Sequence, residues 1–246
     1  MSFAVITREL EASAAYVTAL EQLGLSCVAM PVTRTAPARD PRALVRALDE
    51  GNYAAIVVAS ARAAAALTIR GQTPLPEVWA VGPATARALA ATGVTPVLPP
   101  GAHDAASLAH ALLSARALAG KRVLVPRAED GRDEAISILR AAGVDVREVA
   151  AYRTIAAPSD DPLLARGREL LLAGEAAVCA VFAPSQVTAL AAIAGPLAEL
   201  RTTFAAIGVT TATALHDIGV TRVAVANSPT PEGIANAIAA VYPPGP

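Results

Sequence analysis

The sequence predicts an α/β fold of two similar units, each with a parallel sheet and crossover helices. The first observation is that short apolar runs alternate with helical patterns, as parallel sheets require. The second is that residues 80–94 (AVGPATARALAATGV) recur in similar form as residues 206–220 (AIGVTTATALHDIGV). The third is a second such pair, FAVITR at 3–8 and RVLVPR at 122–127. These repeats predict an internal duplication, and two such units favour a small-molecule site in the cleft between them.

Ten apolar runs are expected to form the strands. In chain order they cover residues 4–7, 27–32, 54–59, 78–82, 96–99, 122–126, 146–152, 178–182, 204–208 and 222–226. The helices between them are expected to end at glycines with a left-handed backbone, notably Gly24, Gly93, Gly143 and Gly219.

Charge and proline cluster in two segments, TRTAPARDPR at 33–42 and TIAAPSDDP at 154–162. Both follow the second strand of their repeat, so they are interpreted as matched linkers at which the chain leaves one unit and later returns to it. The expected domains are therefore a discontinuous one, 1–34 plus 157–246, and a continuous one, 37–152. The linkers are placed at about 33–42 and 153–162.

Composition limits the functional classes. The 246 residues are 54% hydrophobic and carry a net charge of -1, which gives no general basic field for nucleic acid or anionic membranes. The N-terminus MSFAVITREL has no features of a signal peptide, so a cytoplasmic protein is expected. Cys27 and Cys179 lie in apolar runs and are interpreted as free thiols.

One uncharged segment, residues 176–198, is long enough to imitate a membrane span. Pro184 and the Gly195-Pro196 pair interrupt it, so the segment is expected to form a buried strand, a polar loop and a short helix. No membrane association is expected.

The usual catalytic signatures are absent from the sequence: GxSxG, GxGxxG, GxxxxGK[ST], HExxH and CxxC do not occur. The three histidines share no metal-ligand spacing. We therefore expect no metal site, and a serine hydrolase is disfavoured.

Glycine, serine and threonine gather in turns that follow the strands. Such turns lie at the carboxyl ends of parallel strands, where α/β folds bind ligands and where helix amides face an anion. Simple helix capping by the same hydroxyls is the alternative. The turn residues in question are Ser60, Gly82, Thr85, Ser185, Gln186, Gly208, Thr210, Thr211 and Thr230.

Arginines at strand ends and turns, namely Arg8, Arg62, Arg127 and Arg132, could donate forked hydrogen bonds to carboxylates; surface solvation is the alternative for each. Tyr152 ends a strand beside the second linker. A tyrosine hydroxyl carries its proton at neutral pH and could give it to a leaving oxygen. Half-buried packing of an edge tyrosine is the competing interpretation.

Taken in order, these segments resemble the uroporphyrinogen-III synthase family. The resemblance rests on VITR, the AVGPATARAL and AIGVTTATAL pair, GKRVLVPRAEDGRDEAISILRAAGVDVREVAAYRT, APSQV and SPTPEGI, and it spans nearly the whole chain. It implies two flavodoxin-like parallel-sheet domains joined by a two-stranded linker, with the discontinuous domain order given above.

The resemblance also implies an activity: a cofactor-independent lyase that cyclises hydroxymethylbilane to uroporphyrinogen III, with loss of water and inversion of ring D through a spiro intermediate. Tyr152 matches the family tyrosine suspected of assisting departure of the hydroxyl. Thr85, Ser185 and Thr211 match hydroxyl residues that line the cleft, whereas Ala59 and Ala183 replace hydroxyl residues common in the family, so those hydroxyls are not essential here. The full set of candidate binding residues is Arg8, Ser60, Arg62, Gly82, Thr85, Arg127, Gly131, Arg132, Ser185, Gln186, Gly208, Thr210, Thr211 and Thr230.

The expected partner is hydroxymethylbilane, bound by a monomer, and the resemblance suggests transient contact with hydroxymethylbilane synthase. Two other classes compete with this interpretation. A two-domain binding protein for an anionic small molecule would also use such a cleft, but it would usually carry an export signal. A glycosyltransferase with twin α/β units would usually be longer and would need acidic or histidine residues for its sugar nucleotide.

Overall fold

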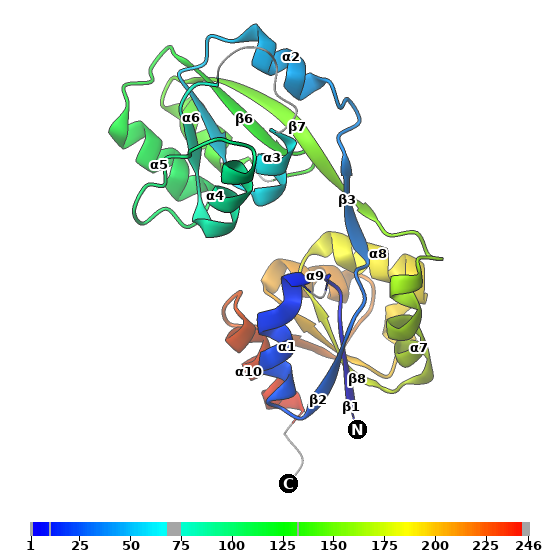
Figure 1. The fold of residues 1–246 in the computed structure, drawn as a ribbon. Helices are drawn as coiled ribbons and strands as arrows, with labels where there is room; N and C mark the ends of the chain where they lie inside the picture. Colours follow the sequence, from blue (N-terminus) through cyan, green and yellow to red (C-terminus); the bar gives the residue numbers. More distant parts are fainter. Residues whose placement is uncertain (1, 10, 68–74, 132, 243–246) are drawn as a thin grey trace. The chain divides into compact units, whose positions relative to one another are not determined.

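Alternating strands and helices build two five-stranded sheets, shown in Figure 1 for a computed structural model of the chain. The structure describes residues 2–9, 11–67, 75–131 and 133–242. The chain divides into unit 1, which contains Met1–Arg34 and Ile155–Pro246, and unit 2, which contains Thr35–Thr154. Both points of division lie in the two segments that are rich in proline and charge.

The sheet of unit 1 has the order β10-β9-β8-β1-β2, and every neighbouring pair in it is parallel. Its strands are β1 (Ser2–Ile6), β2 (Leu25–Ala29), β8 (Ala176–Val181), β9 (Thr203–Ala206) and β10 (Val223–Val225). Its helices are α1 (Ala14–Glu21), α7 (Ala165–Ala173), α8 (Pro184–Ala194), α9 (Val209–Asp217) and α10 (Pro231–Val241), with 3-10 turns at Glu11–Ser13, Pro162–Leu164 and Leu197–Glu199.

The sheet of unit 2 has the order β3-β7-β6-β4-β5, and the β7-β6, β6-β4 and β4-β5 pairs are parallel. Its strands are β3 (Thr33–Pro37), β4 (Ala55–Val58), β5 (Val78–Ala80), β6 (Arg122–Ala128) and β7 (Asp145–Ala156). Its helices are α2 (Ala43–Glu50), α3 (Ala61–Ala66), α4 (Gly82–Ala91), α5 (Ala105–Ala115) and α6 (Glu134–Ala141).

The two sheets share one strand order. Reading β1, β2, β8, β9 and β10 of unit 1 as strands 1 to 5 gives the flavodoxin-like order 2-1-3-4-5. The same numbering can be applied to unit 2, where strands 1 to 4 of the flavodoxin-like order are β6, β7, β4 and β5. The position of strand 5 is taken by Val97, which forms a single parallel bridge to Trp79. The predicted fold class is confirmed, while the internal duplication stays a prediction.

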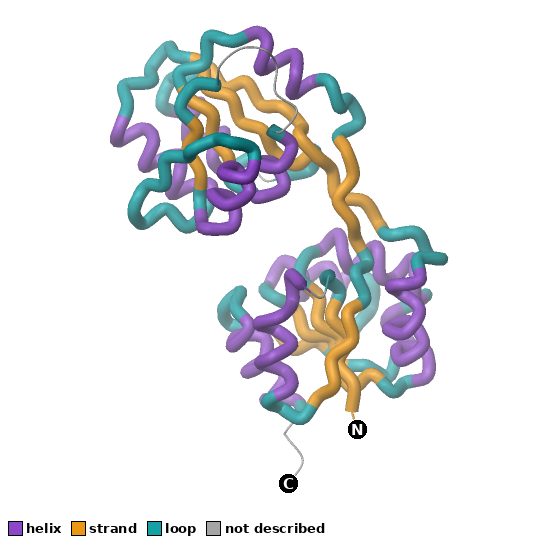
Figure 2. The backbone as a smooth tube through the Cα atoms, in the orientation of Figure 1, coloured by secondary structure: helices purple, strands orange, loops and turns teal. Residues whose placement is uncertain are grey.

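Helices cover both faces of each sheet, as the helices and strands of Figure 2 show. In unit 1, Ala4 and Ile6 pack with α1 and α10, whereas Val5 packs with α7, α8 and α9, because neighbouring strand residues point to opposite faces. In unit 2, Leu124 packs with α2, α3 and α4, and Val123 packs with α5 and α6. A fully buried aliphatic side chain of this kind contributes about 1.5–3 kcal/mol, so these four clusters fix the helices on the sheets.

These faces define a topological switch point in each unit. The helix after β1 covers one face of the unit 1 sheet and the helix after β8 covers the other. In unit 2 the helices after β6 and β4 diverge in the same way. A crevice opens between such diverging connections at the carboxyl edge, which is where ligands of this fold class bind.

Two details of the secondary structure differ from expectation. Residues 96–99 are predicted to form a strand, but only Val97 pairs there, because Pro96 and Pro99 have no N–H to donate. Both predicted linkers contain regular strand despite their proline and charge: β3 lies in 33–42, and β7 continues through 153–156, so that Tyr152 lies inside β7 and not at its end. The expected left-handed helix ends are confirmed, for example at Gly24 (φ +78°) and Gly143 (φ +76°).

The segment 176–198 contains the predicted strand (β8) and helix (α8), but the expected polar loop at 184–186 is wrong, because these residues form the first turn of α8. None of the described helices is long and apolar enough to cross a membrane. Both cysteines are free thiols. Burial raises the pKa of Cys27 to about 11, with a smaller contribution from Glu21, and complete burial raises the pKa of Cys179 further.

Candidate active site

A pocket of about 300 Å³ lies at the carboxyl edge of unit 2, at its switch point. The ends of β4 and β6 form its floor, and the starts of α5 and α6 line its sides. Four residues of the predicted site line it together: Ser60, Arg127, Gly131 and Tyr152.

A bulge in β7 sets the direction of the Tyr152 side chain. The register between β6 and β7 shifts by one residue, so that Arg127 pairs with Ala150 but Ala128 pairs with Tyr152. As a result Ala151 and Tyr152 both pack against the cluster formed with α2, α3 and α4, although neighbours in a regular strand point to opposite faces. Tyr152 is thus half-buried, with its ring on that core and its hydroxyl in the pocket.

The Tyr152 hydroxyl shares a hydrogen bond with Ser60. The two oxygens lie 3.3 Å apart, and either can be the donor. Ser60 is also the N-cap of α3, where its Oγ accepts a hydrogen bond from the Ala63 N–H at 3.1 Å. Because the cap uses Ser60 as an acceptor, its own proton is available to Tyr152, and the cap holds the Ser60 oxygen in place.

Arg127 contributes a cation to this pocket. Its Nη1 donates to Glu148 Oε2 at 2.8 Å, and Arg140 Nη2 donates to the other oxygen of Glu148 at 3.1 Å. Burial alone would raise the pKa of Glu148, but the hydrogen bonds from the two arginines outweigh it and hold that pKa below its usual range. Arg127 Nε is buried and has no hydrogen-bond acceptor among the described residues.

Gly131 lies against the Arg127 side chain. A Cβ at this position would be 3.3 Å from Arg127 Nε and 3.2 Å from the Ala128 carbonyl oxygen, closer than side chains normally approach. The absence of a side chain therefore lets the loop close over the arginine. Arg132, the neighbouring candidate, lies outside the described residues.

Two acids also line the pocket. Asp104 is the N-cap of α5, and hydrogen bonds from Ser107 lower the pKa of its carboxyl. Glu134 begins α6 and contributes to the same lining. The pocket therefore combines the Arg127 guanidinium with carboxylates, and Arg127 is the group in it that attracts a ligand carboxylate.

The remaining candidates in unit 2 do not line this pocket. Arg62 is exposed on α3. Gly82 begins α4 with φ +78°, and Thr85 is 4% exposed within that helix. Thr85 makes no side-chain cap, so helix capping, the alternative interpretation of its hydroxyl, does not apply to α4.

In unit 1 the candidates follow the ends of β1, β8, β9 and β10. Arg8 lies after β1, and Gln186 is buried in the first turn of α8. The hydroxyl of Thr230 caps α10 by accepting from the Gly233 N–H at 3.1 Å, as the capping interpretation predicted. The other four are Ser185 and Thr210, which are exposed, Thr211, which is 1% exposed, and Gly208, which is extended at the start of α9.

Several contributors were not identified from the sequence. Glu148 could have been suspected from its place on the same strand as Tyr152, but nothing in the sequence pairs it with Arg127. Thr7 immediately precedes Arg8, and its partner Gln186 is distant in the chain. Contacts over such separations have no local sequence signal.

Comparison with known proteins identifies the family. A family model described as uroporphyrinogen-III synthase HemD matches residues 14–236. No curated protein sequence matches the chain.

Two solved structures share the fold over almost the whole chain. Uroporphyrinogen-III synthetase from Helicobacter pylori has a TM-score of 0.64 at 17% identity, covering 98% of this chain and 100% of its own. A mutant uroporphyrinogen III synthase from the extremely thermophilic bacterium Thermus thermophilus has a TM-score of 0.54 at 23% identity, covering 97% of each chain. The chain belongs to the uroporphyrinogen-III synthase family.

Proposed function

We propose that this chain is a uroporphyrinogen-III synthase, which cyclises hydroxymethylbilane to uroporphyrinogen III with loss of water and inversion of ring D. Family membership supports the reaction. The observation that carries the chemistry is the Tyr152 hydroxyl, held by Ser60 inside the pocket of unit 2.

In this proposal Tyr152 acts as the general acid. It gives its proton to the hydroxyl of the hydroxymethyl group as the C–O bond breaks, and water leaves. The electron pair of the pyrrole nitrogen stabilises the carbon left behind, which ring D then attacks to form the spiro intermediate. The intermediate reopens and closes with ring D inverted, and loss of a proton restores the aromatic pyrrole.

Ser60 supports this step as a positioning residue. Its cap bond to α3 keeps Oγ fixed, and its hydroxyl can donate to the tyrosine oxygen as that oxygen gains negative charge. Arg127, held by Glu148, binds a substrate carboxylate in the pocket. This contact would help to orient the substrate.

The remaining candidates of the predicted site are proposed to bind substrate carboxylates through hydroxyls, backbone amides or guanidinium groups: Arg62, Gly82, Thr85, Ser185, Gly208, Thr210, Thr211 and Thr230. Exposure of Ser185, Thr210 and Arg62 supports access for these three.

A product assay tests the proposed function. Purified protein is mixed with hydroxymethylbilane, the products are oxidised, and the type I and type III porphyrins are separated by chromatography. The proposal predicts a large excess of type III over a reaction without protein. Formation of type I alone would reject it, since ring closure without inversion gives that isomer.

A further inference from the structure

The switch point of unit 1 contains an arginine, Arg8, that stacks on two aromatic rings. Arg8 lies two residues beyond the end of β1, and its guanidinium carbon is 5.1 Å from the centre of the Phe182 ring and 5.7 Å from that of Tyr16. The two rings meet edge to face, with centroids 4.8 Å apart. Arg8 forms no ion pair with any described residue, so its donors remain available.

The aromatic pair comes from two connections at the switch point and packs on one face of the sheet. Tyr16 lies on α1 and Phe182 lies between the end of β8 and the start of α8 (Figure 1), and both rings pack against the cluster covered by α1 and α10. Contact with the two ring faces restrains the flexible Arg8 side chain without neutralising its charge. An arginine fixed in this way loses less conformational entropy when it binds a planar anion.

Behind Arg8, Thr7 and Gln186 form a buried polar connection. Gln186 Oε1 accepts hydrogen bonds from the Thr7 hydroxyl at 2.7 Å and from the Phe182 N–H at 2.8 Å. The Phe182 N–H requires an acceptor, and this fixes which end of the Gln186 amide faces inward. Thr7 is fully buried, and its hydroxyl also lies 2.9 Å from the Ala180 carbonyl oxygen. The Gln186 amide thus links Thr7, the residue that precedes Arg8, to Phe182, whose ring contacts the Arg8 guanidinium.

We propose that Arg8 forms a carboxylate-binding subsite in unit 1, and that Thr7 and Gln186 are positioning residues that hold it in place. This inference rests on the proposed function, because the carboxylates in question are those of the linear substrate and its cyclic product. Gln186 fixes the backbone at Phe182, whose ring restrains Arg8, and Thr7 fixes the end of β1 from which Arg8 extends.

The test compares variants that lose the same kind of bond at opposite edges of the sheet. Thr7→Val removes the connecting hydroxyl, and Gln186→Leu removes its acceptor. Thr202→Val is the matched control, because Thr202 is also buried and donates to the Ala176 carbonyl oxygen at 2.6 Å, but it lies at the amino edge. Arg166→Ala is the control for Arg8→Ala: Arg166 stacks on Phe3 at 5.5 Å but is already paired with Glu169 at 2.7 Å.

Three quantities are measured on the full chain: the KM and kcat for hydroxymethylbilane, and the Kd for uroporphyrin III, the oxidised form of the proposed product, by calorimetry. Arg8→Ala should raise KM and Kd by about tenfold or more, and Thr7→Val and Gln186→Leu by roughly three- to tenfold, with kcat nearly unchanged. In an Arg8→Ala background the Thr7 and Gln186 changes should have no further effect. Thr202→Val should lower the melting temperature as Thr7→Val does and leave KM and Kd unchanged.

Equal KM and Kd values for Thr7→Val and Thr202→Val would overturn the inference. The inference would also fail if Thr7→Val still raised KM and Kd in the Arg8→Ala background. If Thr7→Val does not fold, Gln186→Leu decides by the same criteria. If the wild-type protein binds uroporphyrin III in an Arg8-dependent way but makes no type III isomer, the proposed function is rejected while the subsite is supported. Wild-type protein that does not bind uroporphyrin III at all would reject the subsite.

Discussion

The hydroxyl oxygens of Tyr152 and Ser60 lie 3.3 Å apart, and the same serine oxygen caps α3. One hydrogen-bonded pair thus joins β7 to the start of the helix that follows β4. The position of the tyrosine oxygen depends on this pair and on the bulge in β7. Changes at the pair and at the neighbouring charges should therefore have separable effects on rate, binding and stability.

Ser60→Ala should affect both stability and rate. Loss of the cap should cost about 1 kcal/mol of the free energy of unfolding. Loss of the partner of Tyr152 should lower the rate of type III formation roughly three- to tenfold. Asp161→Ala is the control, since Asp161 accepts from the Leu163 N–H at 3.0 Å at the 3-10 turn Pro162–Leu164 of unit 1. Equal rates for the two variants would show that Ser60 acts only as a cap.

Arg127→Ala should raise KM for hydroxymethylbilane by about tenfold and lower kcat much less. The reason is that a charge-assisted hydrogen bond to the substrate is lost equally in the bound ground state and in the transition state. The effect should weaken as salt is added. Arg122→Ala serves as the control: Arg122 begins the same strand and pairs with Asp145 at 2.7 Å at its amino end. An unchanged KM in Arg127→Ala would assign the residue to structure.

Acid should destabilise the fold through carboxylates whose pKa is lowered. Glu77 is an example, because hydrogen bonds from Arg116 and Trp79 lower the pKa of its carboxyl. The unfolded chain then binds more protons than the folded one, so this stability is present above a pH of about 4.3 and is lost as the pH falls below it. Urea unfolding followed through the single tryptophan, Trp79, should show a weaker pH dependence in Glu77→Gln. A Glu77→Gln curve with the wild-type pH dependence would contradict the assignment.

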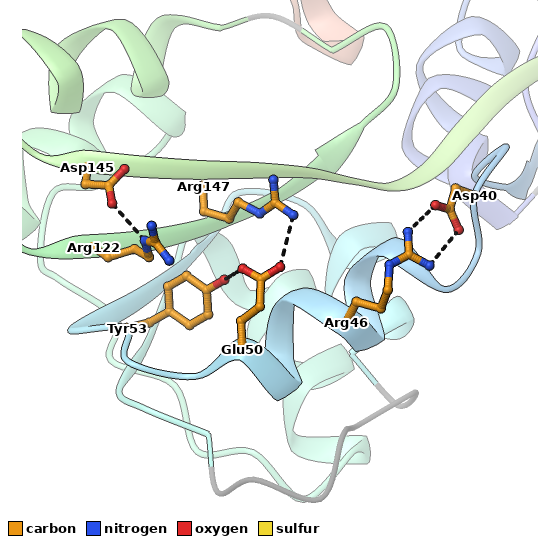
Figure 3. Close-up of polar contacts among 7 residues, drawn as sticks. All are labelled: Asp40, Arg46, Glu50, Tyr53, Arg122, Asp145 and Arg147. Carbon is orange, nitrogen blue, oxygen red and sulfur yellow. Dashed lines mark hydrogen bonds and ion pairs between the residues drawn. The ribbon is translucent and has the colours of Figure 1, made fainter.

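The ion pairs at the amino edge of unit 2 should contribute little. Figure 3 shows Glu50 between Arg147, at 3.3 Å, and the Tyr53 hydroxyl, at 3.5 Å. These side chains are partly solvated, so Arg147→Ala should cost between about 0 and 1 kcal/mol in urea unfolding. Type III formation should be unchanged, because this edge is opposite the pocket. A tenfold loss of activity would contradict that separation.

The sequence predicts the sheets well because their signal is local. Buried strands such as β4 and β8 appear as apolar runs, and glycines such as Gly24 and Gly143 mark helix ends. Strand β3 is interpreted only as linker from its composition, since its pairing with β7 depends on a distant segment. Val97 shows the opposite error, where prolines shorten an apparent strand to one bridge.

The candidate site is predictable only in part. Ser60, Arg127, Gly131 and Tyr152 are singled out by the sequence and lie in one pocket. The bulge that orients Tyr152 cannot be predicted, because it depends on how β7 pairs with β6. The same holds for the Thr7–Gln186 bond, whose two residues are joined only when β1 and β8 become neighbours.

The central claim is that the Tyr152 hydroxyl donates the proton that lets water leave. Tyr152→Phe removes that oxygen and leaves the ring on its core, so folding should survive, as its melting temperature will show. The rate of type III formation in single turnover should fall about 10²-fold. If the chemistry depends mainly on holding a reactive substrate in the right curl, Tyr152→Phe will cost less than about tenfold, and Thr85→Ala with Thr211→Ala will cost more. A Tyr152→Phe enzyme with a near-wild-type rate of type III formation would contradict the general-acid role.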